Sequence, residues 1–140
     1  MDLALLEKAV ENDNNLSIIQ TNIQEIKTRK NDVLQRLVAN KDVLAQLHDK
    51  LRDYRYVETA MEMRLGAAIR WIRLNVDHAE IRLNNPAMIT KIEEINNTIA
   101  IVVRTFNRKH VTLFLYENLL FQKISPEEQI LLKAIGYLSK

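Results

Sequence analysis

Side chains that coordinate metals or transfer protons are few and scattered in this sequence. The three histidines are His48, His78 and His110. His78 lies between Asp77 and Glu80, but this spacing matches none of the usual metal-ligand patterns, and the chain has no cysteine. A glycine-rich phosphate loop, a nucleophile elbow and a spaced pair of carboxylates are also missing. We therefore expect no catalytic residue, no metal site and no cofactor, and hence a protein that is not an enzyme.

The most suggestive chemical grouping is Trp71, the only tryptophan, between Arg70 and Arg73. A tryptophan flanked by arginines on a strand could stack on bases and contact phosphates. The simpler interpretation, which we favour, makes Trp71 the main core residue of a small β domain, with the arginines along its edge. The candidate basic surface of this domain comprises Arg70, Arg73, Arg104, Arg108 and Lys109.

The elements that would carry these residues follow from hydrophobic periodicity. From Leu16 to Leu65 one heptad register holds without a break, and twelve of its fifteen a and d positions are apolar or aromatic. This pattern predicts a continuous coiled-coil helix; the alternative is a helical hairpin that turns at Val38-Ala39-Asn40-Lys41. The predicted partner-binding seam comprises Ile23, Ile26, Lys30, Val33, Leu37, Asn40, Leu44, Leu47, Leu51 and Tyr54.

The charges beside this seam favour a partner other than a second copy. From residue 27 onward, seven of the twelve e and g positions are lysine or arginine, and one is acidic. In a homodimer these flanks would face each other and repel. We therefore expect hetero-association with a protein partner over a homodimer. The alternative is that the long basic side chains cover the seam with their charges in water.

The second half of the sequence has the pattern of short strands closed by a helix. Gly66 is the expected C-terminal cap of the long helix. Strands are predicted at residues 68–74, 99–106, 111–116 and 121–124, residues 89–95 suit helix or strand, and turns are expected at 84–86, 96–97 and 107–110. Ser125, Pro126 and Glu128 together predict a helix start with a capping box.

Together these patterns predict an α+β fold in two parts. Residues 1–65 would form a helical, coiled-coil segment. Residues 66–140 would form a small antiparallel β domain, either a meander or a small barrel, with a capped C-terminal helix.

Composition narrows the function classes. The chain has 140 residues, 47% of them apolar, with a net charge of +2, which by itself is too small to indicate a nucleic-acid binder. Residues 66–140 are slightly basic, with 10 basic and 7 acidic side chains. No apolar run reaches the ~20 residues that span a bilayer, and the N-terminus lacks a signal-peptide pattern. We therefore expect an intracellular protein without membrane insertion.

Two segments of the second half carry a family resemblance. Residues 66–74 contain Ile69-Arg70-Trp71-Ile72 after a glycine, and residues 120–132 contain Phe121-Gln122-Lys123-Ile124-Ser125 before a helix. In these segments the chain resembles small uncharacterised proteins of nucleocytoplasmic large DNA viruses. The resemblance covers residues 66–140 only. It implies a viral protein, located in the host cytoplasm or viral factory, with the virion as a further location.

These observations lead to one functional hypothesis and one alternative. The hypothesis is a non-enzymatic viral structural or assembly-interaction protein that docks through its coiled-coil helix and its β domain. The alternative is a nucleic-acid- or chromatin-associated binding module that reads its target with the basic β domain.

Overall fold

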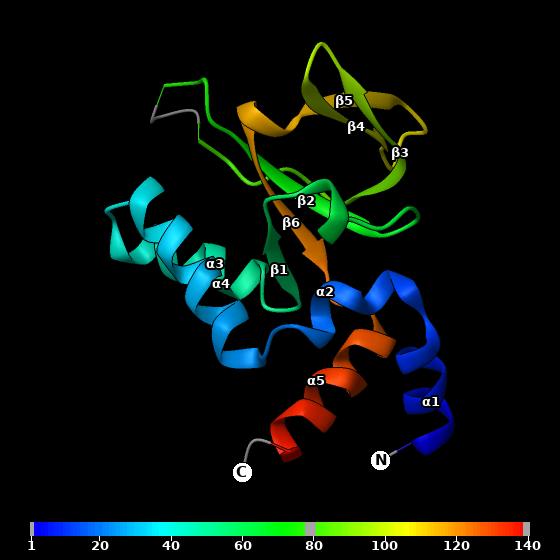
Figure 1. Cartoon of the computed structure of the whole chain (residues 1–140). Coiled ribbons are helices and arrows are strands. Elements are labelled where there is room, and N and C mark those ends of the chain that lie inside the picture. Colours follow the sequence, from blue (N-terminus) through cyan, green and yellow to red (C-terminus); the bar gives the residue numbers. More distant parts are fainter. Residues whose placement is uncertain (1, 78–80, 139–140) are drawn as a thin grey trace. The chain divides into compact units, whose positions relative to one another are not determined.

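The computed structural model describes residues 2–77 and 81–138, and its α+β architecture confirms the predicted fold class (Figure 1). The chain divides into two compact units. The helical unit comprises Met1–Arg55 and Ile124–Lys140, and the sheet unit comprises Tyr56–Lys123. The expected segments, 1–65 and 66–140, divide the chain differently, because the C-terminal helix belongs with the N-terminal helices.

The helical unit is built from short helices. They are α1 (Leu3–Glu11), α2 (Leu16–Ile19), α3 (Ile23–Leu37), α4 (Lys41–Lys50) and α5 (Pro126–Leu138). Helix α5 packs against α1 and α2. Its apolar face joins theirs in a core cluster of Ala9, Ile18, Ile26, Ile130, Leu131 and Leu132.

The prediction of a continuous coiled-coil helix from residue 16 to residue 65 is wrong. Asparagines interrupt it, because their side chains accept hydrogen bonds from the first free amides of a helix. The Asn22 side chain accepts from the amide of Glu25 at 2.8 Å and so begins α3. The Asn40 side chain accepts from Asp42 and Val43 at 2.9 and 3.2 Å and begins α4. The interruption before α4 lies at the turn of the hairpin alternative.

The end of the expected helix is a strand and a 3₁₀ turn. Residues Tyr54–Val57 form β1 and Ala60–Glu62 form the turn. Gly66 therefore caps no long helix. Its φ of +85° lies in a turn before β2, where its amide donates to the Ile89 carbonyl at 2.8 Å.

The sheet has six strands in the described residues, in the order β1-β6-β2-β3-β4-β5. Its remaining members are β2 (Ala68–Arg73), β3 (Ala87–Ile95), β4 (Thr98–Arg104), β5 (His110–Phe114) and β6 (Asn118–Lys123). The pairs β2–β3, β2–β6, β3–β4 and β4–β5 are antiparallel, and the sheet is open. The predicted meander or barrel is therefore an open sheet in which β6 returns beside β2.

Two predicted local features are confirmed. Asn96 and Asn97 form the β3–β4 turn with φ of 52° and 65°, as a type I′ hairpin requires. At the start of α5, the Ser125 amide donates to the Glu128 carboxylate at 3.0 Å, and the Glu128 amide donates to the Ser125 hydroxyl at 3.1 Å. The sheet unit has its own core, made of Val57, Met63, Ala67, Ile69, Trp71, Ala87, Ile89, Ile101, Val103, Leu113 and Leu120.

Candidate functional site

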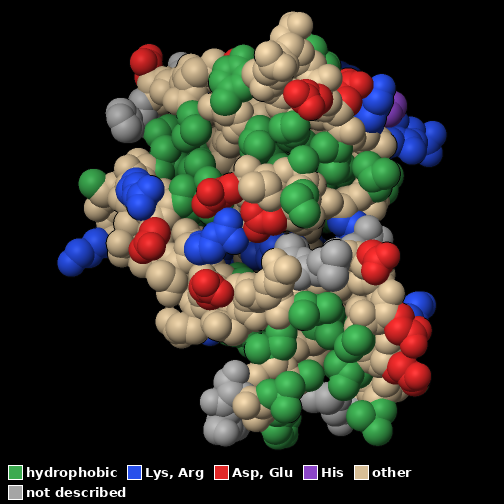
Figure 2. Space-filling view, in the orientation of Figure 1, with side chains coloured by type: hydrophobic (Ala, Val, Ile, Leu, Met, Phe, Trp, Pro, Cys, Tyr) green, Lys and Arg blue, Asp and Glu red, His purple; other side chains and the backbone are tan. Residues whose placement is uncertain are grey.

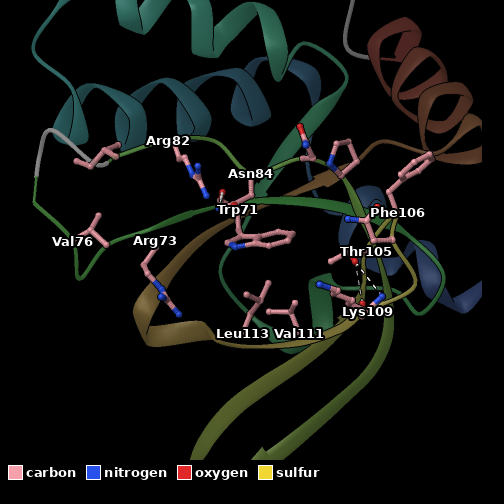
Figure 3. A pocket seen from close by; sticks show the side chains of 14 residues that line it. Trp71, Arg73, Val76, Arg82, Asn84, Thr105, Phe106, Lys109, Val111 and Leu113 are labelled. Atoms are coloured by element: carbon pink, nitrogen blue, oxygen red, sulfur yellow. Dashed lines mark hydrogen bonds between the residues drawn. The ribbon is translucent and has the colours of Figure 1, made fainter.

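A groove of about 930 Å³ opens on the sheet unit. Trp71 and Arg73 reach it from β2, and Val111 and Leu113 reach it from β5, because alternate residues of a strand share one face. In the close view Trp71 lies in the middle of the groove, with Arg73 to one side and Thr105, Phe106 and Lys109 to the other (Figure 3). The other lining residues are Val76, Ile81, Arg82, Asn84, Asn85, Pro86 and Asn107.

One wall of the groove is fixed to β2 by Asn84. The Asn84 amide and its side-chain Nδ2 both donate to the Trp71 carbonyl, at 2.9 and 3.0 Å. The Asn84 carbonyl in turn accepts from Arg70 Nε at 2.8 Å. Because these three bonds tie backbone and side chain to one strand, the segment with Asn84, Asn85 and Pro86 forms a defined wall.

The opposite wall is the turn between β4 and β5. The Thr105 amide donates to the Lys109 carbonyl at 2.8 Å, and the Arg108 amide donates to the Thr105 carbonyl at 2.9 Å. The turn brings Arg108 to a φ of 62° and leaves the Phe106 side chain 93% exposed. A phenylalanine is thus displayed to solvent on a hydrogen-bonded turn.

A second hollow of about 400 Å³ adjoins the groove. Pro86, Thr105 and Phe106 line both, so these three residues form the ridge between them. The second hollow also receives Arg104 and Arg108, together with Ala68, Ala87 and Met88. The groove and the second hollow thus form one surface divided by Phe106.

The charge on this surface has one sign. Arg73, Arg82 and Lys109 line the groove, Arg104 and Arg108 line the second hollow, and no acidic side chain in the described part of the chain lines either. The sheet unit as a whole carries 9 basic and 7 acidic residues. In the space-filling view, lysines and arginines gather with a histidine at the upper right, over the β4–β5 turn (Figure 2). The net charge of the chain is therefore small even though cations are concentrated around the groove and the second hollow.

The structure brings together four of the five predicted basic-surface residues: Arg73, Arg104, Arg108 and Lys109. Arg70 is held half-buried against Asn84 instead. Trp71 is 9% exposed and belongs to the core cluster, as the favoured interpretation predicts, although it also lines the groove.

Three residues of the surface were not predicted from the sequence. Phe106 reads as the end of a strand, Arg82 lies in a segment with little pattern, and Asn84 was expected only as part of a turn at residues 84–86. The signal for Phe106 was its position beside Asn107 and Arg108, because aromatic residues at a hairpin tip have no core to enter.

The predicted seam does not form one surface. Ile26, Lys30, Leu47, Leu51 and Tyr54 are buried, whereas Ile23 and Asn40 are exposed. Val33, Leu37 and Leu44 are half-buried. The seam residues come from two separate helices and a strand. Several of their apolar side chains pack within the chain and are therefore not available to a partner.

Lys30 contacts backbone within the helical unit, where a partner-facing role was expected. Its Nζ donates to the carbonyls of Leu51 and Tyr54 at 2.9 and 3.0 Å. Burial, with a smaller effect from Lys27, lowers the pKa of Lys30 from its ordinary value of 10.5. Burial also lowers the pKa of His48, whose ring is hydrogen-bonded to the Asn31 side chain at 3.0 Å. His48 is half-buried.

Comparison with family models, with curated proteins and with solved structures finds no match to this chain. The resemblance to small viral proteins therefore stays a prediction. Among the residues described, no group of three or more His, Cys, Asp or Glu could hold a metal ion, and His78 itself lies outside them. None of the helices in residues 2–77 and 81–138 is long and apolar enough to cross a membrane.

Proposed function

We propose that this is a non-catalytic binding protein whose sheet unit holds single-stranded nucleic acid in the groove. The observation that carries the proposal is the joint occurrence of three cations, three asparagines and an exposed phenylalanine around one groove. Cations neutralise phosphates, and an aromatic ring provides a stacking platform for a base. Side-chain amides of asparagine donate and accept hydrogen bonds, as base edges require.

The exposed ring favours a single strand over a duplex. Bases of a duplex are stacked on one another, so their faces are closed to Phe106 unless a base is unstacked at a cost of a few kcal/mol. In a single strand every base offers a free face, and stacking on an aromatic side chain contributes about 1–3 kcal/mol per base. The protein would therefore bind single strands more tightly than duplexes of the same sequence.

The hypothesis of a structural or assembly-interaction protein has less physical support than single-strand binding. Its first docking element, the coiled-coil helix, is absent from the described structure. A protein partner with an acidic segment would still match the cations of the groove, but it would make no use of a stacking platform beside them. We therefore treat protein binding as a result to be distinguished by experiment.

The experiment is fluorescence anisotropy with labelled single-stranded DNA and RNA, and with a duplex of the same sequence, at increasing salt. Each phosphate neutralised in a single strand contributes about 0.7 to the slope of log K against log salt, so the three groove cations predict a slope of about −2 or steeper. The double variant Arg73→Glu, Arg82→Glu should lose binding and flatten this slope.

Lys123→Glu is the control for the single variants Arg73→Glu and Arg82→Glu, because Lys123 is exposed and lines neither the groove nor the second hollow. It should bind as the wild type does. Tighter binding to an acidic peptide than to either single strand would overturn the proposal in favour of a protein partner. Equal losses in the control and in the single groove variants would also overturn it, since charge alone would then suffice.

A further inference from the structure

We propose that Phe106 acts as a wedge over which a single strand passes, with the groove holding the nucleotides on one side and the second hollow holding those on the other. This inference rests on the proposed function and adds the path of the strand and the minimum length it must have. Its basis is the position of Phe106 in the lining of both hollows.

The first argument is the exposure of the ring. A side chain that is 93% exposed contributes little to the core, so its packing does not explain its presence. Phe106 lines both the groove and the second hollow, together with Thr105 and Pro86. A strand that crosses the ridge would have adjacent bases separated by the ring or stacked on it.

The second argument is the distribution of charge on either side. Arg73, Arg82 and Lys109 lie on the groove side, and Arg104 and Arg108 lie on the other. A path confined to the groove would leave the two arginines of the second hollow without a phosphate. A path across the ridge passes cations before and after the wedge.

The third argument is the preorganisation of the turn. Thr105 fixes Lys109 through their backbone bond of 2.8 Å and through its hydroxyl, which donates to the Lys109 carbonyl at 3.2 Å. The wedge is thus carried by a turn that is closed before a ligand arrives, which limits the entropy lost on binding. Arg108 occupies the left-handed region in this turn, and its side chain is directed from a position where glycine is usual.

The test is a length series of uridine and deoxythymidine oligonucleotides, from about 2 to about 12 nucleotides, which begins below the smallest site size of about 4 nucleotides known for single-strand binders. Quenching of Trp71, the only tryptophan, reports occupancy of the groove itself. For the wild type, affinity should rise with length until the strand reaches both hollows and then level off. The uridine and deoxythymidine arms compare RNA with DNA, which differ here in the 2′-hydroxyl and in the 5-methyl group of the base.

The variants separate this inference from the proposed function. Arg104→Glu with Arg108→Glu should weaken long strands by tenfold or more while leaving the shortest strands unchanged. Phe106→Leu should weaken long strands by about 5- to 150-fold, the range expected for losing one stacked base, and Phe106→Tyr should restore them. Lys123→Glu again serves as the control for charge.

Each result decides between the two ideas. If the wild type fails to bind any oligonucleotide, the proposed function is wrong. Suppose that the wild type binds oligonucleotides with quenching of Trp71, but that the Arg104, Arg108 variant loses the same affinity at every length or at no length. The proposed function of the groove then stands and the wedge is wrong. Equal affinities of the Phe106→Leu and wild-type proteins would likewise refute the wedge.

Discussion

Arg55 and Glu128 form an ion pair of 3.2 Å in the helical unit, and their side chains are only 3% and 1% exposed. Glu128 also closes the capping box of α5 through the Ser125 amide. One carboxylate thus satisfies the start of a helix and neutralises a cation from β1. Removing one partner of such a buried pair strongly destabilises the folded protein, because the remaining charge is buried away from water.

We expect Arg55→Met to lower the free energy of unfolding by about 3–5 kcal/mol, since it leaves the Glu128 carboxylate buried. Adding Glu128→Gln should recover part of this loss, because the amide removes the charge and keeps an acceptor for the Ser125 amide. Urea denaturation followed by circular dichroism measures both. Arg52→Met is the matched control: its ion pair with Asp49 is on the surface, and its loss should cost less than about 1 kcal/mol. Equal costs at the two arginines would contradict the burial argument.

Substitutions at Asn40 provide the simplest test between a capped helix α4 and a coiled-coil seam. In a seam, Asn40→Leu would replace a polar core residue and stabilise the helix. In the structure the Asn40 side chain caps α4, so Asn40→Leu should cost about 1 kcal/mol, whereas Asn40→Asp should retain the cap. Thermal unfolding of the three proteins provides the measurement, and a more stable Asn40→Leu protein would restore the coiled-coil interpretation.

Lys30 predicts a pH dependence of stability. Its pKa is lowered by burial below 10.5, so between the lowered pKa and 10.5 the unfolded chain binds more protons than the folded chain. Stability from this residue is therefore present above 10.5 and lost as the pH falls through the folded pKa. Relative to Lys30→Met, the free energy of unfolding of the wild type should rise as the pH is raised from neutral toward 10.5. A constant difference over this range would show that burial does not lower the pKa.

Arg108 predicts opposite changes in stability and binding. Its φ of 62° favours glycine, so Arg108→Gly should stabilise the protein, or leave it unchanged, within about 1 kcal/mol. The same change should weaken binding of long single strands, because it removes a cation of the second hollow. Asn97→Gly, at a φ of 65° in the β3–β4 turn and away from both hollows, should leave binding unchanged. An Arg108→Gly protein that binds long strands normally would remove Arg108 from the proposed path.

Local signals in the sequence predicted local structure well. The paired asparagines at 96–97 and the capping box at Ser125 depend only on neighbouring residues, and both are confirmed. The heptad pattern failed because Ile26, Leu47 and Tyr54 are apolar for different reasons: each is buried, but on α3, α4 and β1 respectively. Spacing alone does not show that a capping asparagine has ended one helix and begun another.

Of the five cations at the candidate site, four were predicted from the sequence, whereas Arg82 and the aromatic residue Phe106 were missed. Basic residues on the strands and turns of one predicted domain can be collected from the sequence. The exposure of Phe106 depends on the turn held by Thr105 and Lys109, and the placement of Asn84 depends on a distant contact with Trp71. These tertiary contacts leave no periodic pattern in the sequence.

Photocrosslinking tests the central claim most directly. A single-stranded RNA carrying 4-thiouridine is irradiated in complex with the whole protein, and the crosslinked peptide is identified by mass spectrometry. The account predicts crosslinks in residues 104–109, around Phe106, that are lost in the Arg73→Glu, Arg82→Glu protein and retained in Lys123→Glu. Crosslinks confined to the helical unit, or crosslinks that persist unchanged in the Arg73, Arg82 variant, would contradict it.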